Sequence, residues 1–165
     1  MAIARLDALV QQQVIARRPA PNEFEVARYL AHAAEDFDDA SNSRIYLRGR
    51  FRIACNVSFA SVDALLAAYA FVPPTNRRYY PNVLDVIFDN TPAAALAADM
   101  ADVVARRKTV QGSHGCEIST ATLSRYLEIG VNVNKTERLQ LRALRTCNMD
   151  HTGIIDAHDA LTHSP

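Results

Sequence analysis

The sequence predicts an all-α protein, and three observations support this prediction. Apolar residues recur at spacings of three and four along most of the chain, the period of one face of a helix. Runs typical of strands are few. Isolated β-forming residues follow successive loops at Ile45, Tyr79, Ile118 and Ile155, separated by 34, 39 and 37 positions. A steady period in this range indicates a repeated supersecondary unit.

Composition narrows the class of protein. The chain has 165 residues, which fits one domain or two small ones, and 49% of them are hydrophobic. Equal numbers of acidic and basic residues argue against a nucleic-acid interface and against an acidic ion buffer. Three cysteines without a CxxC pair favour a reducing compartment. No secretory signal and no apolar run of membrane-spanning length is evident, so we expect a cytoplasmic protein without nucleic-acid or membrane partners.

Helix signals divide the chain into elements. An amphipathic helix is predicted over residues 2–18, within an N-terminal extension of residues 1–21, and Asn22 caps a second helix that ends at Phe37. Thr91 followed by proline starts a helix that runs to Val110. Gly130 is a natural C-cap. The other predicted helices are 45–57, 61–71 (capped by Ser61), 82–88, 119–129, 135–147 and a short one from residue 157.

The sharpest local motif covers residues 148–159. A calcium loop needs oxygen ligands at its positions 1, 3, 5, 9 and 12, a backbone carbonyl at position 7 and glycine at position 6 for a sharp turn. Gly153 falls at position 6, and Ile155 falls where paired loops join through a short β-bridge. The ligand positions fall on Asn148, Asp150, Thr152, Ile154 (through its carbonyl), Asp156 and Asp159.

These features resemble the EF-hand superfamily, in particular calmodulin and the myosin light chains. The stretch ISTATLSRYLEIG (118–130) resembles the exit helix of a third hand, and NKTERLQLRALRTCNMDHTGIID (134–156) resembles the entering helix and loop of a fourth. Residues 25–47 and 61–88 resemble the first two hands more loosely. The resemblance implies two lobes of paired hands, at 22–90 and 91–165, after the N-terminal extension.

The first three loops have lost most of the ligands that the family uses. Only the fourth retains enough oxygen ligands, and there Asp159 replaces the usual bidentate glutamate. The resemblance therefore implies at most one weakly bound calcium or magnesium ion. Ligand positions 1, 3, 5 and 12 fall on Asp38, Ala40, Asn42 and Gly49 in the first loop, on Val72, Pro74, Asn76 and Val83 in the second, and on Gln111, Ser113, Gly115 and Thr122 in the third.

The resemblance then implies a light chain or adaptor rather than an enzyme. Such a protein would clamp an amphipathic, IQ-like helix of a larger motor or cytoskeletal protein, largely without calcium, and would be associated with the cytoskeleton. Two alternatives stay open: a weak calcium sensor acting through the fourth loop, and a subunit of a helical structural assembly. The predicted groove for the partner helix is lined by Met100, Val104, Leu123, Tyr126, Leu127, Leu141 and Leu144.

Overall fold

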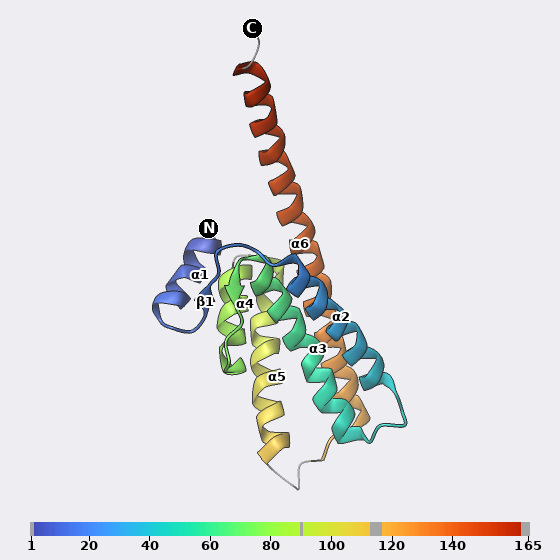
Figure 1. The fold of residues 1–165 in the computed structure, drawn as a ribbon. Coiled ribbons are helices and arrows are strands. Elements are labelled where there is room, and N and C mark those ends of the chain that lie inside the picture. Colours follow the sequence, from blue (N-terminus) through green and yellow to red (C-terminus); the bar gives the residue numbers. More distant parts are fainter. Residues whose placement is uncertain (1, 90, 113–116, 163–165) are drawn as a thin grey trace.

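The computed structural model describes the backbone of residues 2–89, 91–112 and 117–162, and side chains between residues 5 and 144 apart from Pro92. The protein is all-α, as predicted (Figure 1). Two short strands, β1 (Ala16–Arg17) and β2 (Phe71–Val72), form an antiparallel pair, and the 3-10 helices η1 (Arg77–Tyr79) and η2 (Pro92–Ala94) precede two of the α-helices. The α-helices are α1 (Ala2–Gln11), α2 (Glu23–Ser41), α3 (Leu47–Ala68), α4 (Tyr80–Phe88), α5 (Ala95–Gly112) and α6 (Thr120–Thr162).

Helix α3 is the centre of the bundle. It packs against α2 and α6 and also touches α4 and α5 (Figure 1). Its sequence is apolar or small almost all round from Val57 to Ala67, as expected for a helix covered on every side. By length and composition α3 could cross a membrane, contrary to the prediction that no such run exists. However, 78% of that stretch is buried inside the bundle, which is typical of a core helix.

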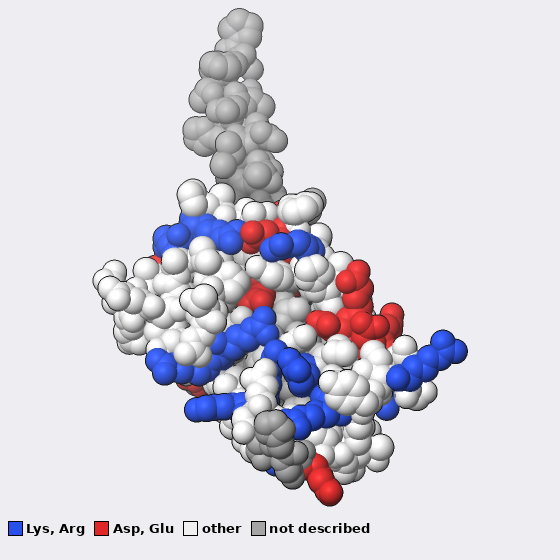
Figure 2. Space-filling model, turned by 60° about the horizontal axis from the view of Figure 1, so that its bottom comes forward, with Lys and Arg blue, Asp and Glu red and all other residues white. Residues whose placement is uncertain are grey.

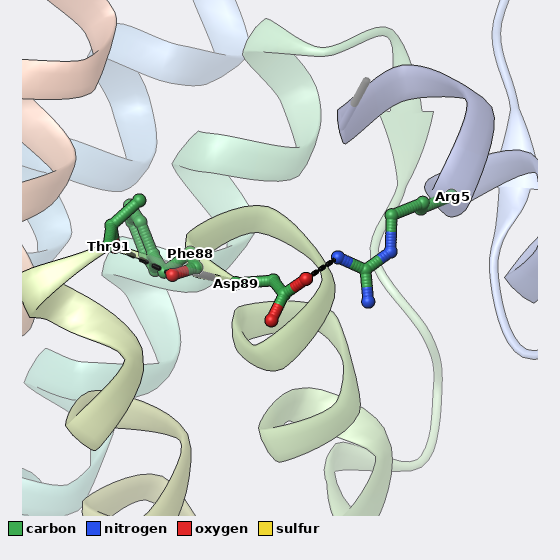
Figure 3. Close-up of polar contacts among 4 residues, drawn as sticks. All are labelled: Arg5, Phe88, Asp89 and Thr91. Atoms are coloured by element: carbon green, nitrogen blue, oxygen red, sulfur yellow. Dashed lines mark hydrogen bonds and ion pairs between the residues drawn. The ribbon is translucent and has the colours of Figure 1, made fainter.

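The N-terminal helix α1 is docked on the body. Leu6 and Leu9 are buried in the main core. Arg5 forms an ion pair with Asp89, which follows α4, and nearby Thr91 turns the chain by donating from its hydroxyl to the Phe88 carbonyl (Figure 3). The helix ends at residue 11 rather than 18, because the chain reverses there and then pairs β1 with β2.

Several predicted helix ends are absent. Helix α3 is continuous through the predicted break between residues 57 and 61, where the Ser61 hydroxyl donates to the Val57 carbonyl, 3.0 Å away, instead of capping a new helix. Helix α6 is continuous through Gly130 and through the segment predicted to be a calcium loop. A serine can satisfy its hydroxyl within a helix in this way, so it marks a helix start only weakly.

Because α3 and α6 are continuous, the breaks predicted between the first and second hands and between the third and fourth hands are absent. The exit helix of the first hand and the entering helix of the second become α3, and those of the third and fourth become α6. One hydrophobic cluster contains residues from α1, α3, α4, α5 and α6, on both sides of the predicted boundary at residues 90 and 91. The structure therefore does not confirm the arrangement of two EF-hand lobes.

Candidate functional site: a groove between α2 and α6

The seven residues predicted to line a partner groove lie in or against the core. The side chains of Met100, Leu123, Tyr126 and Leu141 are buried. Val104, Leu127 and Leu144 are partly buried and pack against the same cores. The Tyr126 hydroxyl donates to an Asp102 carboxylate oxygen at 2.9 Å, which ties α6 to α5. Most of these residues fill the bundle, and Val104 also lines a pocket between α5 and the segment that joins β2 to α4. Their contact with a partner helix stays a prediction.

The predicted metal site has a different backbone from the one expected. Helix α6 runs through residues 148–159, so the sharp turn predicted at Gly153 is not formed. Side chains of the six predicted ligands lie outside the described residues, and weak calcium or magnesium binding stays a prediction. Among the side chains that the structure describes, no group of three His, Cys, Asp or Glu residues could hold a metal ion.

An open groove of about 490 Å³ lies instead between α2 and α6, with α3 beneath it. Buried Ala33 and Val57 form an apolar floor. Phe37, Val131 and Leu139 line the sides and are 36%, 43% and 58% exposed. Exposed apolar side chains that gather in a concave site commonly mark a binding surface. This α2–α6 groove is lined by Ala33, Ala34, Phe37, Asp38, Val57, Val131, Asn134, Lys135, Arg138, Leu139 and Arg142.

The groove forms because α2 meets α6 at only one end. Val26 of α2, Ala67 of α3 and Leu141 of α6 pack into a small buried cluster, with Tyr29 and Leu30 against it. Further along α2, Ala33 and Ala34 take the place of large residues, and Ala33 packs on Val57 and Ala60 of α3. Phe37 is the large apolar residue of this half of α2, and it lines the side of the groove instead of closing it, so a channel remains beside α6.

The two sides of the groove carry opposite charge. Helix α6 contributes Lys135, Arg138 and Arg142, which follow one another at spacings of three and four and so lie on one side of the helix. Helix α2 contributes Asp38. The guanidinium of Arg138 donates to the Asn134 side-chain oxygen at 2.9 Å, which fixes Arg138 along the rim. The basic side of the groove would attract acidic groups on a ligand.

Polar groups of α6 and α3 meet beneath α6, and one of them, Asn134, also lines the groove. The Asn134 amide donates to the Ser61 hydroxyl at 3.1 Å, and that hydroxyl donates in turn to the Val57 carbonyl. Ser58 and Glu137 are also buried, and their side-chain oxygens have no hydrogen-bond partner among the described residues. We call these four residues, Ser58, Ser61, Asn134 and Glu137, the polar seam.

Glu137 is the unusual member of the polar seam. It is 1% exposed, and burial raises the pKa of its carboxyl to about 8, opposed by the charge of Arg138 and by the Ser61 hydroxyl. The Ser61 hydroxyl donates its proton to the Val57 carbonyl, so it does little to stabilise the charged form of Glu137. The carboxyl is therefore protonated at neutral pH, because the interior disfavours its charged form.

Gly130 allows α3 and α6 to approach closely at the floor of the groove. A Cβ at this position would lie 3.0 Å from Cγ1 and 3.1 Å from Cβ of Val57. Val57 Cβ is attached directly to the α3 backbone and cannot move aside freely. The sequence pattern predicted a helix C-cap at this glycine, whereas in the structure it lets two helices pack closely.

Sequence reasoning missed the groove, although one signal was present. Val131, Lys135, Arg138 and Arg142 are spaced by four, three and four residues, the pattern of one continuous helical stripe. The predicted linker after Gly130 interrupted this stripe and hid it.

Among the cysteines, Cys55 is buried in the core, and burial raises the pKa of its thiol to about 12, so it is not a thiolate nucleophile at neutral pH.

Fold and site together define this chain as an all-α bundle with an open, mostly apolar groove on its surface. Comparison with protein-family models, with curated protein sequences and with solved structures finds no match for the chain.

Proposed function

We propose that this protein is an adaptor that binds an amphipathic helix of a partner protein in the α2–α6 groove. The observation that supports this most directly is the exposure of Phe37, Val131 and Leu139 around one concave apolar site. A helix that lies in a groove presents apolar anchors at spacings of three and four. The walls of this groove are themselves helical stripes with those spacings, so a third helix can pack between them.

The charge of the rim indicates what the bound helix carries. Lys135 and Arg138 border the apolar floor on the α6 side, and acidic residues along one edge of a partner helix would lie against them. The proposed binding uses the apolar floor and the basic rim and involves no metal ion. The resemblance of the sequence to light chains makes helices of motor or cytoskeletal proteins the partners to try first.

The proposal is tested with synthetic helical peptides and the full chain. One peptide carries a leucine stripe flanked by glutamates, and a second carries the same stripe flanked by lysines. We expect the acidic peptide to bind more tightly in fluorescence polarisation, with a preference that weakens as salt is added. Equal binding of both peptides would remove the basic rim from the proposal.

Variants locate the binding surface. Leu139→Asp places a charge in the groove at an exposed position, and it should weaken binding by about tenfold or more, since burying such a side chain is worth about 1.5–3 kcal/mol. Phe24→Asp is the matched control, because Phe24 is an exposed apolar residue of α2 outside the groove. If both variants bind like the unmodified protein, the groove is not the site. Self-association of the chain without peptide would instead favour a helical assembly subunit.

A further inference from the structure

A second pocket, separate from the groove, is strongly basic. It measures about 650 Å³ and lies between α5 and the segment that joins β2 to α4, with Phe59 of α3 at its base. Its cationic residues are Arg77 and Arg78 from η1 and Arg107 and Lys108 from α5. None of its described lining residues is acidic. Figure 2 shows Lys and Arg side chains gathered across the face that carries the lower ends of the helices, with a group of acidic side chains to their right and a few others near the centre and the bottom of the view.

The arrangement forces positive charges together around one aromatic ring. The guanidinium carbons of Arg77 and Arg107 lie 4.7 and 4.9 Å from the centroid of the Phe59 ring. Burial lowers the pKa of Arg107, and repulsion from Arg77 and Arg52 lowers it further, opposed by the electrostatic effects of Cys55 and Asp36. A bundle with equal numbers of acidic and basic residues therefore concentrates like charges at one place, which is unfavourable without a counter-charge.

Internal partners leave much of this charge uncompensated. Arg107 donates to the neutral side-chain oxygen of Asn56 at 2.6 Å. Asp63 interacts with the charge of Arg77, but its carboxylate is buried behind the pocket and accepts from the Tyr80 hydroxyl. Within the described part of the chain, none of the four cations of the pocket forms an ion pair with a carboxylate. The pocket therefore has the charge of an anion site.

We propose that this pocket binds a small anion that carries two or more phosphate groups. A guanidinium presents paired N–H donors that match phosphate oxygens, and a lysine adds a point charge beside them. Four cations exceed what one carboxylate or one phosphate would neutralise, whereas two phosphates supply comparable charge. Side chains of Thr75 and Asn76, at the mouth, can donate to the same oxygens.

The extent of the basic surface favours a small ligand over a nucleic acid. A nucleic-acid strand follows a continuous basic track across many phosphates. Here the group of acidic side chains to the right of the basic ones on the same face would repel a strand that continued in that direction (Figure 2). A pocket of about 650 Å³ also falls within the size range of small-molecule sites.

The test uses the full chain and inorganic tripolyphosphate in isothermal titration calorimetry. We expect binding in a 1:1 ratio that weakens as salt is added, with orthophosphate much weaker than tripolyphosphate. Vesicles of phosphatidylcholine, with or without a bisphosphorylated phosphoinositide, form a second arm. Binding of free tripolyphosphate alone indicates a soluble ligand, and additional binding of phosphoinositide vesicles indicates a lipid headgroup. No heat of binding at millimolar tripolyphosphate would overturn the proposal.

Variants inside and outside the pocket distinguish binding at this site from a general electrostatic attraction of the anion to the protein. Arg107→Gln and Lys108→Gln should each weaken tripolyphosphate binding by about tenfold or more. Arg106→Gln makes the same charge change on the same helix outside the pocket and should change affinity by less than about twofold. Circular dichroism checks folding, and because Lys108 is exposed, its substitution leaves the core unchanged. Equal losses of tripolyphosphate affinity in all three variants would overturn the proposal. So would a single-stranded oligonucleotide that binds more tightly than tripolyphosphate and whose binding also depends on Arg106.

Discussion

Glu137 offers the sharpest test of how α6 is held against α3. Its carboxyl is buried without a hydrogen-bond partner among the described residues, and burial raises its pKa from 4.5 to about 8. Glu137→Gln keeps the size and shape of the side chain but removes its ionisation. We expect little change in the free energy of unfolding at low pH and clear stabilisation at alkaline pH.

The sign and size follow from proton linkage. Because the pKa of Glu137 is higher in the folded state than in the unfolded state, the stability associated with the neutral carboxyl is fully present below about pH 4.5 and is lost as the pH rises to about 8. The slope reaches about 1.4 kcal/mol per pH unit. Across the whole window the loss is at most about 5 kcal/mol, which is large against the 5–15 kcal/mol that typically holds a domain together.

The assay is urea unfolding followed by circular dichroism at about pH 5, 7 and 9, with the free energy of unfolding taken at each pH. The difference between Glu137→Gln and the unmodified protein should grow with pH. Glu128→Gln is the matched control, because Glu128 is an exposed glutamate on the same helix. If the two variants show the same pH profile, Glu137 is not buried as the structure shows, and its carboxyl does not titrate with the raised pKa.

Two further substitutions test the packing around α3. Gly130→Ala should destabilise the protein by about 1–3 kcal/mol through the clash with α3, although alanine is the better helix former by about 1 kcal/mol. Gly112→Ala is the control: a Cβ there meets nothing within 4 Å, so the variant should be neutral or stabilising in the same denaturation assay. Equal effects of the two substitutions would contradict the close approach of α6 to α3. Tyr80→Phe removes the hydroxyl that donates to Asp63, and it should raise the pKa of that carboxyl above its present value of about 6. The free energy of unfolding should fall by about 1–3 kcal/mol, and the loss should be largest above pH 6, where the carboxylate is charged. An unchanged Asp63 pKa in an NMR titration would refute this hydrogen bond.

Signals that act within a few residues were predicted well. Asn22 accepts from the Glu25 backbone N–H at 3.1 Å and begins α2, and Thr91 accepts from the Ala93 N–H at 3.2 Å and begins η2, which leads into α5. Both caps depend only on the residue type and on the turn that follows it. The sequence therefore contained enough information for these helix starts.

The errors arose where tertiary packing decides the conformation. Ser61 and Gly130 are residues that commonly sit at helix ends, yet both lie inside long helices, because Ser61 bonds within α3 and Gly130 brings α6 close to Val57. Local propensity cannot distinguish a terminating glycine from a packing glycine, since both need the absence of a Cβ. Misplacing these two residues divided α3 and α6 and produced the repeat of helix–loop–helix units.

The groove depends on relations that no local pattern contains. Phe37 and Leu139 become neighbours of one concave site only because α2 and α6 pack against α3 and diverge from each other. The basic stripe of α6 was visible as spacing, but its position beside an apolar channel was not. The same holds for the basic pocket, where Arg77 and Arg107 meet over Phe59 from elements 30 residues apart in sequence.

Asn134 connects the groove to the interior of the bundle. Its amide donates to Ser61 in the polar seam, while its oxygen accepts from Arg138 on the rim of the groove. A bound helix whose acidic residues engage Arg138 would therefore act on the hydrogen bonds that hold α6 on α3. Any such ligand also stabilises the docked position of α6 by mass action, because the groove exists only when α6 is in place. Ionisation of Glu137 weakens the contact of α6 with α3, because the interior disfavours the charged carboxylate. A ligand in the groove and the charge of Glu137 therefore act on this contact in opposite directions.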